Sequence, residues 1–170
     1  MAVVATERGR PRTARFGGRL LAAAVAAAAL AGCATATNSQ NPGRMQISTA
    51  QAPHLGQILV NKTGRTLYLF VADPPNQSTC SGACASIWPP ATTEGAPTTA
   101  GSAQRSQVAT ISRSDGPPQI VYGGHPLYYY QADTGRGDTL GEALTQFGAE
   151  WYAVSPQGQQ VESGTSAGPP

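Results

Sequence analysis

The sequence lacks the short motifs of several enzyme and cofactor classes. It contains no Gly-x-Ser-x-Gly nucleophile motif, no glycine-rich phosphate loop ahead of a helix and no zinc-ligand spacing. It also lacks a Cys-x-x-Cys-His haem attachment site and the alternating oxygen ligands of a calcium loop. We therefore predict no catalytic residues, no metal site and no cofactor, and we expect that the protein is not an enzyme.

A strong positive charge is also missing once the N-terminal segment is set aside. The whole chain has a net charge of +2, but residues 1–32 contain five of its 11 basic residues and one of its 9 acidic residues. The remaining chain therefore has six basic and eight acidic residues, a net charge of −2. Without a basic patch that could follow phosphates, we expect no binding to nucleic acid.

No apolar run is long enough to cross a bilayer. The apolar run from Leu20 to Leu30 is well short of the roughly 20 residues that a bilayer core requires. It follows a basic segment, a combination typical of a secretory signal. No two arginines are adjacent there, so we expect general export rather than the twin-arginine route. Residues 1–32 are therefore predicted to be a signal peptide.

The apolar run ends in Leu30-Ala31-Gly32-Cys33. This segment resembles the bacterial lipobox, in which the cysteine receives a diacylglyceryl group and cleavage occurs just before it. The resemblance implies a lipoprotein, with palmitate-type chains on Cys33 that attach it to the extracytoplasmic side of the cell membrane. The alternative is an ordinary secretory signal whose apolar run happens to end in cysteine.

Cysteine is scarce, and its count fits export. With Cys33 lipidated, Cys80 and Cys84 remain, an even number that favours a disulfide in an oxidising compartment. Four residues apart on a helical turn, their Cα atoms can come within the roughly 4.4–6.8 Å that a disulfide needs. The alternative is thiol–disulfide cycling or Cu(I) binding, because soft thiolates select Cu(I). His54 and His125 are the only imidazoles that could assist.

The composition divides the exported chain into three parts. Residues 33–52 are polar and predict a flexible tether, and residues 159–170 are rich in Gly, Ser and Pro and predict a disordered tail. Residues 53–158 remain as the folded domain, in which residues 91–104 predict a mobile loop.

The folded domain has the pattern of β-strands rather than of helices. Gly-containing turns at residues 61–64 and 123–124 each separate two apolar segments and predict two hairpins. Helix is limited to short turns at residues 81–87 and 138–147. The predicted strands are residues 57–60, 65–71, 108–111, 119–122, 125–130 and 151–154, and residues 115–118 predict a turn.

The two hairpins share a repeated pattern. Residues 67–73 and 127–133 both read Leu-Tyr-x-aromatic-x-Ala-Asp, and each copy is followed by a tryptophan, Trp88 or Trp151. Two copies are too few for a solenoid and indicate two related units that share one core. We therefore predict an all-β fold: two related antiparallel β units packed as a small sandwich or barrel-like core, with short helical turns, after an N-terminal signal segment.

The repeated residues resemble those of a known family. The copies match a Tyr-x-(Phe/Trp/Tyr)-x-x-Asp motif, and nearly all of residues 55–158 is similar to a bacterial family of secreted-repeat lipoproteins named for it. The diproline at Pro117-Pro118 is a departure. The family's function is unknown, so the resemblance predicts a fold unit and no mechanism. The motif residues are Tyr68, Phe70, Asp73, Tyr128, Tyr130 and Asp133.

The motif residues favour a structural role over a catalytic or ligand-binding one. In a strand, Tyr68 and Phe70 point to one face and the flanking leucines to the other, and the second copy follows the same rule. Asp73 and Asp133 sit where each strand ends, where a carboxylate can accept hydrogen bonds from turn amides. The alternative is a carboxylate pair that binds a ligand or metal.

These observations predict a membrane-anchored extracytoplasmic lipoprotein that carries a non-enzymatic binding or structural β domain. Its partners are the membrane, through the lipid on Cys33, and an envelope protein as a further candidate. The alternative is a redox- or copper-handling lipoprotein that uses Cys80 and Cys84. A hydrolase that uses Asp73 and Asp133 has no nucleophile or base to support it.

Overall fold

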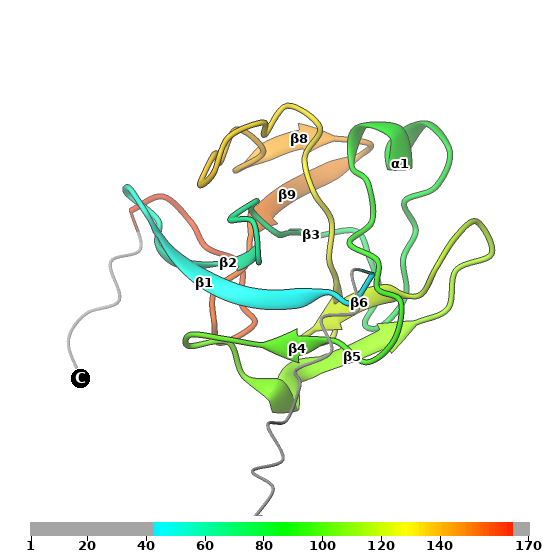
Figure 1. Cartoon of the computed structure of the whole chain (residues 1–170). Helices are drawn as coiled ribbons and strands as arrows, with labels where there is room; N and C mark the ends of the chain where they lie inside the picture. The colour runs from blue at the N-terminus through cyan, green and yellow to red at the C-terminus, as the bar shows by residue number, and fades with distance from the viewer. Residues whose placement is uncertain (1–42, 165–170) are drawn as a thin grey trace, which may run out of the picture. The chain divides into compact units, whose positions relative to one another are not determined.

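The computed structural model describes residues 43–164, so Cys33 and the predicted signal peptide lie outside the described part. The described chain is almost entirely β, with three small sheets, one helical turn α1 (Ala83–Ile87) and one 3-10 turn (Arg105–Gln107) (Figure 1). This confirms the all-β prediction and the short turn at 81–87. No helix within residues 43–164 is both long enough and apolar enough to span a membrane.

The first sheet has the order β2-β1-β4 and begins earlier than expected. β1 (Gln46–Ala52) pairs antiparallel with β2 (Gly56–Asn61) and parallel with β4 (Thr98–Thr99). The predicted tether of residues 33–52 is therefore wrong over residues 46–52. Ile47 and Ala52 are buried, and this small apolar set is enough to place a polar-looking strand in the sheet.

The second sheet contains the predicted glycine hairpin. β5 (Val108–Ile111), β6 (Gln119–Tyr122) and β7 (His125–Pro126) are antiparallel neighbours in that order. Gly123 and Gly124 form the β6–β7 turn with positive φ angles of 58° and 88°, which glycine adopts without strain. The β5–β6 hairpin corresponds in repeat position to the β1–β2 hairpin.

The third sheet differs most from expectation. β3 (Tyr68–Phe70) does not continue a hairpin with β2 beyond the Val60–Thr66 bridge; it pairs instead with β9 (Ala149–Ala153). The predicted helical turn at 138–147 is wrong, because it contains β8 (Leu144–Gln146), which pairs with β9. In Figure 1, β8 and β9 lie above β3, and the β5–β6 hairpin lies below it.

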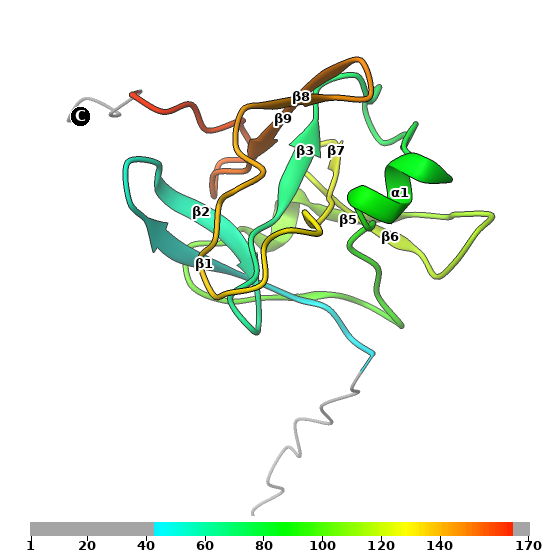
Figure 2. The same cartoon turned by 90° about the horizontal axis from the view of Figure 1, so that it is seen from above.

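The two repeats meet at equivalent residues and exchange strands. Tyr68 and Tyr128 donate backbone hydrogen bonds to each other's carbonyls, both at 2.9 Å, and β3 and β7 lie side by side (Figure 2). β3 of the first repeat pairs with β9, which holds Trp151 of the second. Conversely, Tyr129 donates to Pro89, beside Trp88 of the first repeat, at 2.8 Å. Each motif segment is therefore completed by the tryptophan segment of the other repeat.

The motif strands separate two clusters of buried residues. Tyr68 and Phe70 belong to an aromatic cluster with Trp88, Tyr128 and Trp151. Leu67, Leu69 and Leu127 belong to an aliphatic cluster on the other face. The predicted alternation of the two faces is confirmed.

Two segments that looked unstructured contribute to the fold. Val161 is buried and its amide donates to Ala153 at 2.9 Å, so the predicted tail of 159–170 is wrong at its start; residues 165–170 lie outside the described part. Residues 91–104, expected to be a mobile loop, include β4 and bury Ala91 and Thr93. Thr93 Oγ1 accepts a hydrogen bond from the Met45 amide at 3.0 Å, which ties this segment to the start of β1.

Candidate functional site

The tyrosines and aspartates of the motif bond to each other across the two repeats. The Tyr68 hydroxyl donates to Asp133 Oδ2 at 2.6 Å, and the Tyr128 hydroxyl donates to Asp73 Oδ2 at 2.5 Å. All four residues are buried. Hydrogen bonds from a hydroxyl to a buried carboxylate are among the stronger ones in proteins. The motif therefore forms two crossed pairs, each joining one repeat to the other.

The second oxygen of each carboxylate holds the loop that follows it. Asp73 Oδ1 accepts from the Thr79 amide at 2.7 Å, and Asp133 Oδ1 accepts from the Leu140 amide at 2.9 Å. This is the bonding of a loop-fixing carboxylate. The two aspartates bond to different tyrosines and different loops, and so form no shared pair.

Burial disfavours the ionised forms of the paired tyrosines and of Asp133. It raises the pKa of both Tyr68 and Tyr128 well above the ordinary tyrosine range, and the neighbouring carboxylates add to the effect. Burial also raises the pKa of the Asp133 carboxyl, although the Tyr68 hydrogen bond acts in the opposite direction. The phenols therefore stay protonated donors at neutral pH and are unsuited to act as nucleophiles.

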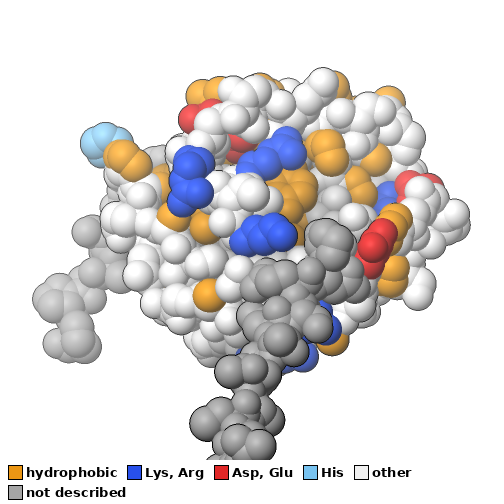
Figure 3. All heavy atoms as spheres, viewed as in Figure 1, with side chains coloured by type: hydrophobic (Ala, Val, Ile, Leu, Met, Phe, Trp, Pro, Cys, Tyr) orange, Lys and Arg blue, Asp and Glu red, His pale blue; other side chains and the backbone are white. Residues whose placement is uncertain are grey.

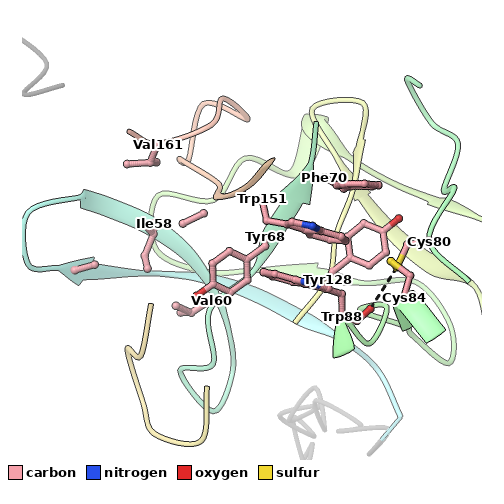
Figure 4. Packing of buried hydrophobic residues seen from close by; sticks show 12 residues of the cluster. Ile58, Val60, Tyr68, Phe70, Cys80, Cys84, Trp88, Tyr128, Trp151 and Val161 are labelled. Atoms are coloured by element: carbon pink, nitrogen blue, oxygen red, sulfur yellow. Dashed lines mark hydrogen bonds between the residues drawn. A yellow bond between two sulfur atoms is a disulfide. The ribbon is translucent and has the colours of Figure 1, made fainter. Parts of the chain in front are cut away.

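A row of four aromatic rings lies at the centre of the aromatic cluster, and Figure 4 shows the rings of Phe70, Trp151 and Trp88. Phe70 stacks on Trp151 at 4.2 Å between ring centroids and Trp151 on Trp88 at 3.9 Å, and Tyr130 packs against Trp88 at 4.4 Å with its ring tilted by 30°. Tyr68 meets Trp88 edge-on and Tyr128 meets Trp151 edge-on. Each aromatic residue of one repeat thus has a counterpart in the other. Both tryptophans are fully buried in this stack.

One glutamine satisfies both buried indoles. Trp88 Nε1 donates to Gln146 Oε1 at 2.8 Å, and Trp151 Nε1 donates to the Gln146 backbone carbonyl at 3.0 Å. A buried indole N–H without an acceptor would cost stability. Gln146 lies in β8, the segment that we predicted as helical, and no sequence signal identified it.

The two remaining cysteines are joined, which confirms the predicted disulfide. Cys80 and Cys84 have Cα atoms 5.2 Å apart, and both are buried in the aromatic cluster near Trp88 (Figure 4). Arg113 Nη2 donates to the Cys80 carbonyl at 3.1 Å and holds the loop from outside.

The two histidines lie on different segments of the fold from the cysteines. His54 is exposed in the β1–β2 turn with a φ of 65°, and His125 is half-buried in β7, where burial lowers its pKa. Within residues 43–164, no three His, Cys, Asp or Glu side chains are grouped so that they could hold a metal ion.

A surface pocket of about 620 Å³ opens where the aromatic stack ends. Tyr130, the last ring of the stack, forms part of its wall, and Phe147 and Gln146 line it from the β8–β9 turn. None of the residues 43–164 that line the pocket carries a charged side chain. Its lining residues are Ile87, Tyr130, Gln131, Ala132, Gln146 and Phe147.

Phe147 is in an unusual conformation for a large side chain. Its φ is 56°, a left-handed value that costs a bulky residue strain, and its side chain is 48% exposed. Gly148 follows with a φ of 94°, so the pair forms a tight turn between β8 and β9. Strained residues that hold an apolar ring in solvent tend to occur at functional sites. Sequence reasoning missed the pocket; the Phe147-Gly148 dipeptide between apolar segments was the one available turn signal.

Comparison with known proteins returns one family. The family described as a secreted repeat of unknown function matches residues 49–92 and residues 109–155, together more than half of the chain. Each match includes one copy of the Leu-Tyr-x-aromatic-x-Ala-Asp pattern. No curated protein and no solved structure matches the chain. With two matched repeats arranged as intertwined halves of one β domain, the chain belongs to the family of secreted repeats of unknown function.

Proposed function

We propose that the protein is a membrane-anchored extracytoplasmic lipoprotein whose β domain binds a ligand rather than catalysing a reaction. The observation that carries this proposal is the commitment of the motif to the core. Tyr68 and Tyr128 donate to Asp133 and Asp73, and both aspartates also hold their own loops. The residues that most resembled a catalytic pair are thus engaged in structure, and the surface pocket is left as the place for recognition.

The anchor is supported by the sequence before the described part. Leu30-Ala31-Gly32-Cys33 ends a short apolar run behind a basic segment, as in a lipid-modified signal. The chain belongs to a family of secreted repeats, which fits an extracytoplasmic location. A single residue, Cys33, therefore decides whether the exported domain is released or retained at the membrane.

Metabolic labelling with an alkyne analogue of palmitate tests the anchor. The full chain should take up the label and sediment with membranes, and Cys33→Ala should lose both properties. The double variant Cys80→Ala/Cys84→Ala is the matched control and should keep the label. Equal labelling of Cys33→Ala and the original chain would refute the anchor.

The pocket's chemistry favours a neutral saccharide. The rings of Tyr130 and Phe147 offer apolar faces on which a sugar ring can pack, and the amides of Gln131 and Gln146 can bond its hydroxyls. Because Gln146 Oε1 accepts from Trp88, the orientation of that amide is fixed. Few polar groups in a mainly apolar pocket are typical of small-molecule sites, and the uncharged lining disfavours ionic ligands.

An array of neutral oligosaccharides probed with the purified mature chain tests the ligand class. We expect binding that Phe147→Ala reduces about tenfold or more, because the ring packs directly on the ligand. Leu140→Ala is the matched control, since Leu140 is 61% exposed and lies outside the pocket lining. Absence of binding, or equal binding by Phe147→Ala, would show that the pocket does not take such a ligand.

The alternative of redox or copper handling draws less support. Both uses require accessible thiolates. Cys80 is 1% exposed and Cys84 is 8% exposed, and the two sulfur atoms are bonded to each other. Thiol titration of the folded protein with and without mild reductant separates the two functions: a bond that resists reduction until the domain unfolds supports the structural role.

A further inference from the structure

The domain's few cations are unevenly placed. The described residues carry six Lys and Arg side chains against eight Asp and Glu. Three of the six, Lys62, Arg65 and Arg136, gather around the turn at residues 61–65, and we call this set the basic face. Figure 3 shows Lys and Arg side chains around a hydrophobic group on this side of the molecule. A mildly acidic domain thus presents one locally positive surface.

Specific contacts hold the basic face together. Arg136 Nη1 donates to the Thr63 carbonyl at 2.9 Å, which brings the 133–138 loop onto the turn that contains Lys62. Arg65 Nη2 donates to the Tyr130 carbonyl at 2.8 Å, and its guanidinium lies 4.6 Å from the Tyr129 ring centroid.

None of these three cations forms an ion pair with a residue of the described part. The 133–138 loop carries two acids: Asp133, which is buried and interacts electrostatically with Arg65, and Asp138, which accepts from the amides of Thr134 and Gly135. With three cations against these two carboxylates, the face keeps a small excess of positive charge.

The basic face lies where the chain enters the domain. Met45 Sδ accepts a hydrogen bond from the Tyr129 hydroxyl at 3.5 Å, so the start of β1 lies against the ring that Arg65 covers. Cys33 is ten residues before Gly43, a span that reaches at most about 35 Å in any conformation. A lipid on Cys33 would therefore keep the point where the chain enters the domain, beside the basic face, within about 35 Å of the bilayer surface.

We propose that the basic face docks the domain on the anionic headgroups of the membrane to which Cys33 attaches it, an inference that rests on the proposed anchor. Charge complementarity selects this partner: unpaired cations near an anionic bilayer surface are attracted to it, by about fivefold in partitioning for each cation. Docking by this face gives the domain one preferred orientation. Oligosaccharide or protein partners of the pocket play no part in it.

Vesicle co-sedimentation of the unlipidated mature chain, Cys33→Ser, tests the docking without the anchor. Binding to phosphatidylcholine vesicles that contain one third phosphatidylglycerol should exceed binding to phosphatidylcholine alone. It should vanish at high salt, because dissolved ions screen the attraction between the cations and the headgroups. Arg136→Gln should weaken it about fivefold, and Lys62→Gln/Arg136→Gln about twentyfold.

Arg105→Gln is the matched control. Like Arg136, Arg105 is exposed and donates to a backbone carbonyl, that of Pro97, but it lies outside the basic face, in the turn before β5. It should change vesicle binding less than twofold. Equal binding to both vesicle types, or an equal loss with Arg105→Gln, would overturn the proposal. Because the variant carries no lipid, this result is independent of the palmitate labelling that tests the anchor.

Discussion

At the scale of single residues, the motif is a set of mutual hydrogen-bond partners. A tyrosine and an aspartate that lie 65 or 55 residues apart in the chain would each be costly to bury alone, because an unpaired phenol or carboxylate loses its water. Tyr68 with Asp133 and Tyr128 with Asp73 remove that cost for each other. Loop groups donate four further hydrogen bonds to these residues, among them the amide and hydroxyl of Thr79 to Asp73. These bonds fix the loops against the core.

The carboxylate of Glu142 is half-buried, with only one of its two oxygens hydrogen-bonded within the described residues. Its Oε2 accepts from the Ala153 amide at 2.8 Å, whereas its Oε1 is buried without a hydrogen-bond partner among the described residues. Burial raises the pKa of the Glu142 carboxyl to about 7. The folded state then holds a proton that the unfolded state releases above its ordinary pKa of 4.5. Stability from this group is therefore lost as the pH rises from about 4.5 to about 7.

Glu142→Gln should remove that loss. We expect the variant to gain about 1 kcal/mol over the original chain at pH 8, a value discounted because the side chain is only half-buried, and to gain little at pH 4.5. Urea unfolding at both pH values measures the difference. Glu150→Gln, on the exposed side of β9, is the control and should change stability by less than about 0.5 kcal/mol at either pH. A Glu142→Gln gain that is the same at both pH values would contradict the account.

At the scale of elements, the 139–143 loop closes the aromatic stack from one side. Gly141 is buried, and a Cβ added there would lie 2.8 Å from Trp88 Cη2 and 2.9 Å from Tyr68 Cζ. The Gly141 amide also donates to the Tyr68 hydroxyl at 3.3 Å. The φ angle of Gly141 is not positive, so its backbone conformation does not require glycine. Glycine is needed there because the rings of Trp88 and Tyr68 leave no room for a Cβ.

Gly141→Ala should therefore loosen the stack. Overpacking against two rigid rings is expected to cost about 1–3 kcal/mol of unfolding free energy and to alter the near-ultraviolet circular dichroism of the tryptophans. Gly116→Ala is the matched control, because a Cβ there meets nothing within 4 Å and its φ is not positive. Equal stability of the two variants would argue against the tight loop–stack contact.

The sequence predicted those elements whose structure depends on neighbouring residues alone, such as turn glycines and the alternation of side chains along a strand. The β6–β7 hairpin followed from Gly123-Gly124, and the faces of β3 followed from alternation around Tyr68. β1 was missed because its alternation is carried by small and polar residues around Ile47. β8 was missed because it becomes a strand by pairing with β9, and its own residues show no strand pattern. The crossed Tyr–Asp pairs depend on how the two repeats meet, which no single-strand pattern contains.

At the scale of the whole domain, the two repeats are halves of one core rather than neighbours. β3 pairs with β9 across the repeats, and the two central rings, Trp88 and Trp151, come from different repeats. Within residues 43–164 the strands form three small sheets that do not close into a barrel. A secreted repeat with this arrangement needs its second copy to bury the tryptophan of the first.

Separated repeats should therefore fail to fold. Fragments of residues 33–106 and 107–170 are each expected to show no cooperative urea transition, because each leaves its tryptophan and its motif strand unpaired. Mixed in equal amounts, they should regain the tryptophan circular dichroism of the intact chain. A single fragment that unfolds cooperatively on its own would show that the repeats are independent units.

The motif tyrosines and aspartates build the core by bonding across the repeats. Double-mutant cycles measure this most directly: Tyr68→Phe with Asp133→Ala, and Tyr128→Phe with Asp73→Ala, followed by urea unfolding. Each cycle cancels the bonds that the aspartate makes to its own loop and isolates the crossed bond. We expect a coupling free energy of about 1–3 kcal/mol for both pairs. Losses that add to within about 0.5 kcal/mol in both cycles would contradict it.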